Sequence, residues 1–138
     1  VNPYNFDYIA KTDTDTVIFP KLFLDKVVNQ LPRFPHNVRV YGGDAVIKPS
    51  VEELLVGPAY MAGRLYWMSP DLARYITSND CPRNKLALFS EDKSIGNFVH
   101  SHPLPIRRIR VDKTTFRHPA KQPEEFLAHW KNHLLMTD

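Results

Sequence analysis

The placement of the prolines constrains the fold of this chain more than any other feature of its sequence. The 138 residues include twelve prolines but only five glycines. A proline fixes φ and lacks a backbone N–H, so it is tolerated in the first turn of a helix and ends a helix elsewhere. The prolines therefore predict a few regular elements that are joined by long, ordered connections.

Four segments have the alternation and the aromatic or β-branched residues that are typical of β-strands. They are residues 6–11, 38–41, 60–68 and 106–111. We expect the second strand to end at Gly42 and Gly43, and the third to be interrupted near Gly63. The fourth alternates apolar and basic side chains, which predicts a half-buried strand. Residues 44–58 and 79–84 are expected to form loops.

Four other segments have apolar residues at helical spacing. They are residues 20–31, 70–76, 91–99 and 123–134. Pro20 and Pro70 stand where a first helical residue is favoured. Ser69 and Ser90 stand where an N-terminal cap is favoured. Strands that alternate with helices predict the α/β class and a single domain over residues 1–138.

Charge and cysteine content exclude some classes of protein. Lys and Arg outnumber Asp and Glu by 18 to 15, and the whole surplus lies in residues 70–138. That surplus fits an anionic ligand, but a net charge of +3 is too small to require a nucleic acid. Cys81 is the only cysteine, which excludes an intrachain disulfide and a multi-cysteine zinc site. No run of about 18 apolar residues is present, so no membrane-spanning helix is expected.

An acidic turn, Asp13-Thr14-Asp15, follows the first predicted strand. In open α/β sheets, ligands bind beyond the carboxyl ends of the strands. Two carboxylates one residue apart can reach a hard divalent cation such as Mg²⁺ or Mn²⁺, which prefers a few carboxylates together with phosphate oxygens. The alternative is a solvated turn that binds nothing. The spacing leaves both interpretations open.

A second acidic pair, Glu91-Asp92, stands at a predicted helix start. A carboxylate there can act as general base toward a hydroxyl nucleophile, or it can simply favour the helix N-terminus. Two aromatic residues, Tyr66 and Trp67, can stack on a sugar ring or pack in the core. The basic run Arg107-Arg108-Ile109-Arg110 can contact phosphate or form an exposed strand face.

Taken in order, four blocks of this sequence resemble the family 31 glycosyltransferases, which include β-1,3-galactosyl- and N-acetylglucosaminyltransferases. The blocks are YIAKTDTDT at residues 8–16, VYGG at 40–43, PAYMAG with YWMS at 58–69, and SEDKSIG at 90–96. The resemblance implies the C-terminal part of a GT-A domain, a Rossmann-like α/β fold with a mixed sheet and flanking helices. The N-terminal nucleotide-binding strands of that domain are expected to be missing.

The resemblance also implies an activity and roles for residues. The activity is Mn²⁺-dependent, inverting transfer of galactose or N-acetylglucosamine from a UDP-sugar to a glycan hydroxyl, in β-1,3 linkage. By position in the family pattern, Asp15 would bind the metal directly and Asp13 would contact the metal's waters or the nucleotide. His118 is the best match for the histidine ligand of the family. Asp92 would be the catalytic base, and Glu91 would help to place the substrates.

The same resemblance adds donor- or acceptor-binding roles and a location. Four residues complete the predicted site in these roles: Lys11, Gly63, Tyr66 and Trp67. The partners implied are the UDP-sugar and the glycan acceptor, with no nucleic acid. The family implies a membrane-anchored parent protein in the lumen of the Golgi or the endoplasmic reticulum.

Several positions depart from the family pattern. Thr14 replaces the middle acid of the motif, Leu65 replaces a glycine that lets the backbone approach a ligand, and Lys93 replaces a valine. These departures motivate a second hypothesis, a degenerate, non-catalytic relative. A third hypothesis is a basic module that binds nucleic acid, and its residues would be Arg107, Arg108, Arg110, Lys113 and Arg117.

Overall fold

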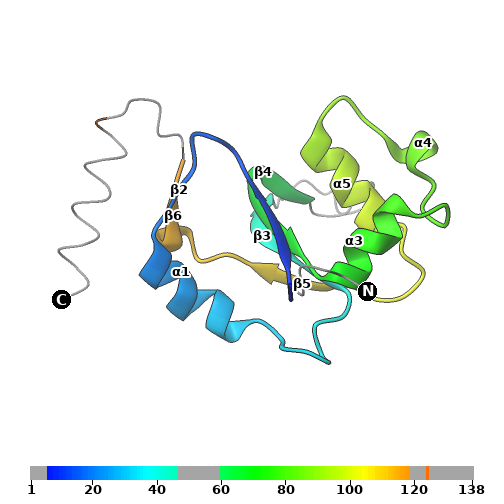
Figure 1. Cartoon of the computed structure of the whole chain (residues 1–138). Helices are drawn as coiled ribbons and strands as arrows, with labels where there is room; N and C mark the ends of the chain where they lie inside the picture. The colour runs from blue at the N-terminus through cyan, green and yellow to red at the C-terminus, as the bar shows by residue number, and fades with distance from the viewer. Residues whose placement is uncertain (1–5, 47–59, 119–123, 125–138) are drawn as a thin grey trace, which may run out of the picture.

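A computed structural model describes residues 6–46, 60–118 and 124 of the chain. These residues form a small α/β domain in which helices flank a mixed sheet (Figure 1). Of the helix predicted at residues 123–134, only Glu124 lies within the described residues, and it is helical. Most of the loop predicted at residues 44–58 also lies outside them.

The main sheet has four strands in the order β1-β4-β3-β5. Their bounds are Ile9–Thr12 for β1, Tyr60–Met68 for β4, Val40–Val46 for β3 and Arg107–Arg110 for β5. Strand β4 is antiparallel to both of its neighbours, and β5 is parallel to β3. A separate antiparallel pair joins β2 (Val17–Ile18) to β6 (Phe116–Arg117). All four predicted strands are present, and the mixed sheet is confirmed.

Strand β3 continues through the two glycines at which it was predicted to end. Gly42 pairs with Trp67 and Gly43 pairs with Tyr66 in the ladder to β4. A Cβ atom on Gly42 would lie 2.4 Å from the indole of Trp67, so only glycine fits beneath that ring. Gly43 has φ +147° and lies close to the carbonyl oxygen of Leu65. The prediction was wrong because these glycines make room for a bulky neighbouring strand.

An irregularity in the sheet follows directly after Gly43. The next paired residues are Ala45 and Met61. The two-residue step from Gly43 to Ala45 on β3 therefore faces the longer stretch from Tyr66 back to Met61 on β4. The residues of β4 between these pairs include Gly63, where an interruption was predicted. Such a shift redirects side chains and commonly lies next to functional sites.

The helices begin close to where the sequence predicts. Helix α1 spans Pro20–Lys26, α3 spans Pro70–Thr77 and α5 spans Glu91–His100. Helix α1 is shorter than predicted, because a 3₁₀ turn, η1 (Val28–Gln30), replaces its last part. A short helix α4 (Arg83–Leu86) overlaps the segment predicted as a loop, and a second 3₁₀ turn, η2 (Lys113–Thr115), precedes β6.

The two predicted caps occupy the N-cap positions, but neither caps its helix through its side chain. The Ser69 hydroxyl instead accepts a hydrogen bond from the backbone N–H of Val40, which ties the start of α3 to β3. The Ser90 hydroxyl donates to the carboxylate of Asp92. Both serines therefore connect the helix start to the sheet or to the candidate site.

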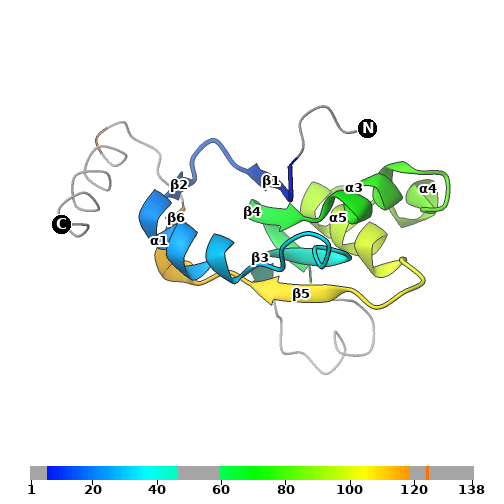
Figure 2. The same cartoon turned by 60° about the horizontal axis from the view of Figure 1, so that its bottom comes forward.

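The core consists of two clusters, one on each face of the sheet. Alternate residues of β4 divide between them, with Tyr66 and Met68 on one face and Leu65 and Trp67 on the other. Helices α3 and α5 cover the first face, and the α1–η1 segment covers the second (Figure 2). Among the described residues, no helix is both long and apolar enough to cross a bilayer.

Candidate functional site

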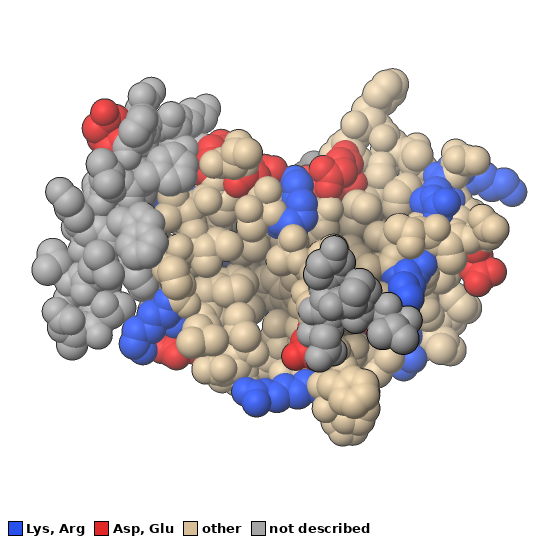
Figure 3. Space-filling model, viewed as in Figure 1, with Lys and Arg blue, Asp and Glu red and all other residues tan. Residues whose placement is uncertain are grey.

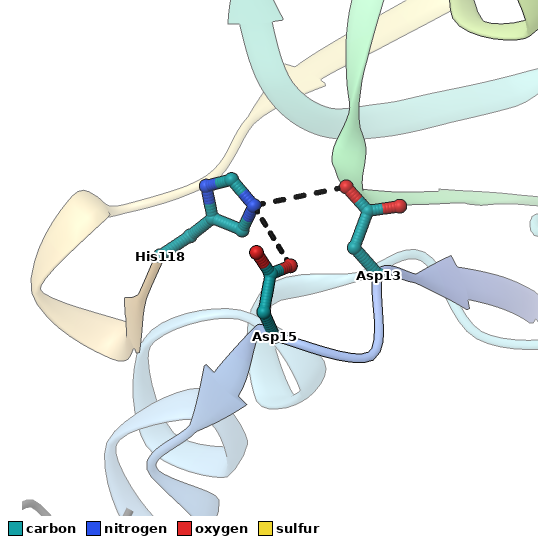
Figure 4. Close-up of side chains that lie close together, drawn as sticks. All are labelled: Asp13, Asp15 and His118. Carbon is teal, nitrogen blue, oxygen red and sulfur yellow. Dashed lines mark ion pairs between the residues drawn. The ribbon is translucent and has the colours of Figure 1, made fainter. Parts of the chain in front are cut away.

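Three side chains that were predicted to bind a metal lie together in the structure. Asp13 and Asp15 are on the connection between β1 and β2, and His118 directly follows β6. Because β2 pairs with β6, the end of β6 lies beside this connection. The His118 Nε2 atom lies 3.0 Å from Asp15 Oδ1 and 3.8 Å from Asp13 Oδ2 (Figure 4). One ligand atom from each residue lies within 4.8 Å of the others.

This trio fits a divalent cation. Two carboxylate oxygens and one imidazole nitrogen suit a first-row ion such as Mn²⁺. The Asp13 and Asp15 side chains are 39% and 34% exposed, so water or a phosphate oxygen can complete the coordination from the open side. The Nδ1 atom of His118 is buried without a hydrogen-bond partner among the described residues, which leaves Nε2 as the nitrogen that faces the carboxylates.

The acidic turn is fixed to strand β4 by backbone contacts. The carbonyl oxygen of Arg64 accepts hydrogen bonds from the Asp13 N–H at 3.4 Å and from the Thr16 hydroxyl at 2.9 Å. The Thr16 N–H closes the turn on the Asp13 carbonyl at 3.1 Å. Thr14, which departs from the family pattern, is exposed at the tip of this turn. The two acids are therefore held in place independently of the residue between them.

Lys11 joins the metal trio to the second acidic pair. Its Nζ atom donates to Asp13 Oδ1 and to the Gly63 carbonyl, both at 2.8 Å, and lies 3.5 Å from Glu91 Oε2. Burial lowers the pKa of Lys11, but its hydrogen bond to Asp13 and the charge of Glu91 outweigh burial and raise that pKa overall. Lys11 therefore remains a cation between the two groups of carboxylates.

Asp92, the predicted base, is held on the first turn of α5. Its Oδ2 atom accepts a hydrogen bond from the Gly63 N–H at 3.2 Å, and its Oδ1 atom accepts from the Ser90 hydroxyl and from the Lys93 N–H. Burial raises the pKa of Asp92, but these hydrogen bonds outweigh burial and lower the pKa overall. The carboxylate is therefore ionised at neutral pH, and the same hydrogen bonds make it a weaker base.

Glu91, the second member of the pair, contacts a buried tyrosine. The Tyr66 hydroxyl donates to Glu91 Oε1 at 2.7 Å. Burial and this hydrogen bond to a carboxylate strongly raise the pKa of Tyr66, so its hydroxyl keeps its proton. The bond fixes one oxygen of Glu91, and the other oxygen faces Lys11.

Two adjacent residues of β4, Gly63 and Arg64, connect the whole site through their backbone atoms. The Gly63 N–H binds Asp92 and its carbonyl binds Lys11, while the Arg64 carbonyl binds the acidic turn. A Cβ atom at residue 63 would lie 3.1 Å from Lys11 Nζ and 3.8 Å from Asp92 Cβ. Glycine at this position therefore lets the two halves of the site approach the same strand.

Both aromatic residues that were predicted to bind sugar are buried, which is the core-packing alternative. Trp67 is 2% exposed and packs edge-to-face on Phe23 at 6.0 Å, so the prediction that it binds a substrate is corrected. The Tyr66 ring is also buried, and only its hydroxyl reaches the site. Leu65 is fully buried in the same cluster as Trp67, on the face of the sheet opposite Tyr66. The leucine that replaces the family's glycine is therefore part of the core.

The basic residues of the third hypothesis lie on β5, η2 and β6. Strand β5 is an edge strand whose three arginines are exposed while Ile109 packs inward, as predicted. Lys113 lies 3.8 Å from the carboxylate of Asp44, and Lys93 lies 5.8 Å from the ring centre of Tyr60. On the face shown in Figure 3, basic and acidic side chains alternate across the surface.

Sequence reasoning missed three residues of the site. No role was predicted for Arg64 or Thr16, and the contact of Ser90 with Asp92 was not predicted. Ser90 offered a local signal, since a serine two residues before an acid at a helix start can bind that acid. The role of Arg64 depends on its backbone carbonyl, which no sequence pattern reveals.

The sequence was also compared with protein-family models and with curated proteins. No family model matches the chain, and no curated protein gives a significant match.

Proposed function

We propose that this chain is the part of a metal-dependent glycosyltransferase that contains the metal ligands and the catalytic base. The supporting observation is that Asp13 and Asp15, on one turn, and His118, from a distant part of the sequence, offer ligand atoms within 4.8 Å of one another. A network of hydrogen bonds and ion pairs through Lys11 and Gly63 joins them to the carboxylates at the start of α5. A diphosphate site and an acceptor base need this kind of proximity.

The proposal specifies the substrates by the resemblance. The donor is UDP-galactose or UDP-N-acetylglucosamine, and the acceptor is a glycan hydroxyl that becomes β-1,3-linked with inversion. The domain would have a GT-A fold, and the parent protein would be anchored in the membrane of the Golgi or the endoplasmic reticulum. The mixed sheet with flanking helices is compatible with that fold.

The metal ligands and the catalytic base would act at two different positions of the site. Asp13, Asp15 and His118 would hold a divalent ion, which when bound supplies Lewis-acid stabilisation for a diphosphate leaving group. Asp92 would accept the proton of the acceptor hydroxyl at a carboxylate oxygen as the new glycosidic bond forms. General-base assistance of this kind typically accelerates a reaction by about 10²–10⁴-fold. Lys11 would neutralise the carboxylates that surround it.

The metal assignment is tested by calorimetric titration of UDP into the chain, with and without Mn²⁺. We expect binding that depends on Mn²⁺ and that weakens at least tenfold in Asp15→Ala. The matched control is Asp25→Ala, because Asp25 is an exposed acid on α1 that pairs only with Lys21 among the described residues. Equal binding by Asp15→Ala and by the control would contradict the assignment.

The base assignment needs a separate test. Asp92→Asn should lower sugar transfer by about 10²–10⁴-fold while UDP binding stays within threefold of the unsubstituted chain. The asparagine keeps an acceptor oxygen for the Gly63 N–H, so the turn should remain folded. Full transfer by this variant would eliminate Asp92 as the base.

A non-catalytic relative is the second candidate, and one observation favours it. The Lys11 ammonium already occupies the position between Asp13 and Glu91, so these carboxylates are neutralised without a bound ion. Such a protein would bind a sugar nucleotide but transfer nothing. UDP binding by a chain that shows neither transfer nor hydrolysis of a UDP-sugar would support this candidate.

A further inference from the structure

A fully exposed aromatic residue lies just ahead of the predicted base. Phe89 is fully exposed and its neighbour Leu88 is 56% exposed, on the connection between α4 and α5. Figure 1 shows this connection at the upper edge of the molecule, where α5 begins. Phe89 is three residues from Asp92, so its position is tied to that of the base.

The connection is held by specific contacts, which distinguishes it from a loose loop. The Ser94 side chain is buried, and its hydroxyl accepts a hydrogen bond from the Leu88 N–H at 2.8 Å. The same hydroxyl lies 3.1 Å from the Leu88 carbonyl oxygen and 2.8 Å from that of Ser90. Ser90 in turn binds the carboxylate of Asp92. The backbone on both sides of Phe89 is therefore fixed to the first turn of α5.

An apolar ring that is held in water exposes apolar surface, which is unfavourable in free energy. A ligand that covers the ring removes this surface from water. Burying an aromatic side chain is favourable by the apolar area taken from water, and a preorganised surface loses little entropy on binding. A pyranose ring has one face of C–H groups that suits contact with an aromatic ring, and its hydroxyl edge suits a carboxylate. Phe89 supplies an aromatic ring and Asp92 supplies a carboxylate, and both lie on one short segment.

We propose that Phe89, with Leu88 beside it, forms a platform for the acceptor sugar, on which the ring packs while its hydroxyl faces Asp92. The choice of ligand rests on the proposed glycosyltransferase function. The inference goes beyond that function because it assigns acceptor recognition to a residue outside the metal site and outside the acidic pair.

The probe for this proposal is methyl β-D-galactopyranoside, a small glycoside whose only ring is the sugar. Its affinity is measured by saturation-transfer NMR titration on the 138-residue chain, without UDP or metal. We expect binding to weaken about threefold to tenfold in Phe89→Ala, the range that loss of one aromatic contact gives. Phe89→Tyr keeps the ring and should bind as the unsubstituted chain does.

The matched control is Phe34→Ala. Phe34 is another exposed phenylalanine, 81% exposed, and it lines a separate pocket together with Phe6 and Pro70. The control should leave the affinity unchanged. Equal affinity for Phe89→Ala and the control, or no binding by the unsubstituted chain, would overturn the proposal.

The test separates this inference from the proposed function. UDP binding in the presence of Mn²⁺ should be the same for Phe89→Ala and the unsubstituted chain, because Phe89 is not part of the metal site. If the chain does not bind UDP but glycoside binding depends on Phe89, the donor site is wrong and the sugar platform stands. If UDP binds and glycoside binding is indifferent to Phe89, only the platform is wrong.

Discussion

Replacing Arg64 with methionine should destabilise the fold by about 3 kcal/mol. The Asp44 side chain is only 2% exposed, and the Arg64 guanidinium is its hydrogen-bonded partner. Removing one partner of a buried ion pair typically costs about 3–5 kcal/mol, because the other charge stays buried without compensation. The lower end applies here because Arg64 is partly exposed and Lys113 lies 3.8 Å from Asp44. A loss of about 3 kcal/mol corresponds to roughly 10 °C in Tm for a domain of this size.

The measurement is a urea titration of four chains, followed by far-ultraviolet circular dichroism. They are the unsubstituted chain, Arg64→Met, Asp44→Leu and the double variant. The double variant should recover most of the lost free energy of unfolding, because replacing both partners removes the buried charge. The reasoning is refuted if Arg64→Met lies within about 1 kcal/mol of the unsubstituted chain, or if the double variant is no more stable than Arg64→Met.

Three other contacts give further predictions. Gly42→Ala should lower the free energy of unfolding by about 1–3 kcal/mol in the same titration, because its Cβ would lie 2.4 Å from Trp67. Adding Trp67→Phe should recover part of that loss. An unchanged midpoint for Gly42→Ala would contradict the packing. Asp92→Asn should cost about 1 kcal/mol at pH 7. Because folding lowers the pKa of Asp92, that difference should hold above the unfolded value of about 3.9 and disappear as the pH falls through the folded pKa, whereas a difference that grows in acid would reverse the sign. Lys11→Gln should tighten Mn²⁺ binding about fivefold in a calorimetric titration because it removes a cation 2.8 Å from Asp13, and weaker binding would show that the charge of Lys11 is needed to position that acid.

The sequence predicts the elements whose causes are local. Pro20 and Pro70 begin helices as expected, because a proline favours the first helical position wherever the rest of the chain lies. The alternation of residues 60–68 predicts a strand, and the strand is present. The acids at residues 13 and 15 stand at the end of a strand, as their position after the first apolar run predicts.

The sequence is less informative where the role of a residue depends on its contact with a distant part of the chain. The pair Gly42 and Gly43 was taken for the end of a strand because glycine usually weakens strands, yet both lie within β3. The indole of Trp67 and the backbone of Leu65 occupy the space that side chains would need. Trp67 itself was assigned to the site, and the structure places it in the core because its neighbour Tyr66 faces the other side of the sheet.

The candidate site shows the same division. Its residue types could be named from the sequence, since carboxylates after a strand and at a helix start suggest a metal ligand and a base. Their association depends on long-range pairing: the pairing of β2 with β6 brings His118 to the acidic turn, and Gly63 accepts a hydrogen bond from Lys11 at its carbonyl and donates its N–H to Asp92. Local preferences are set by each residue and its neighbours in the chain. Contacts between distant segments are set by which sheet registers bury the most apolar surface, and only the tertiary structure decides that.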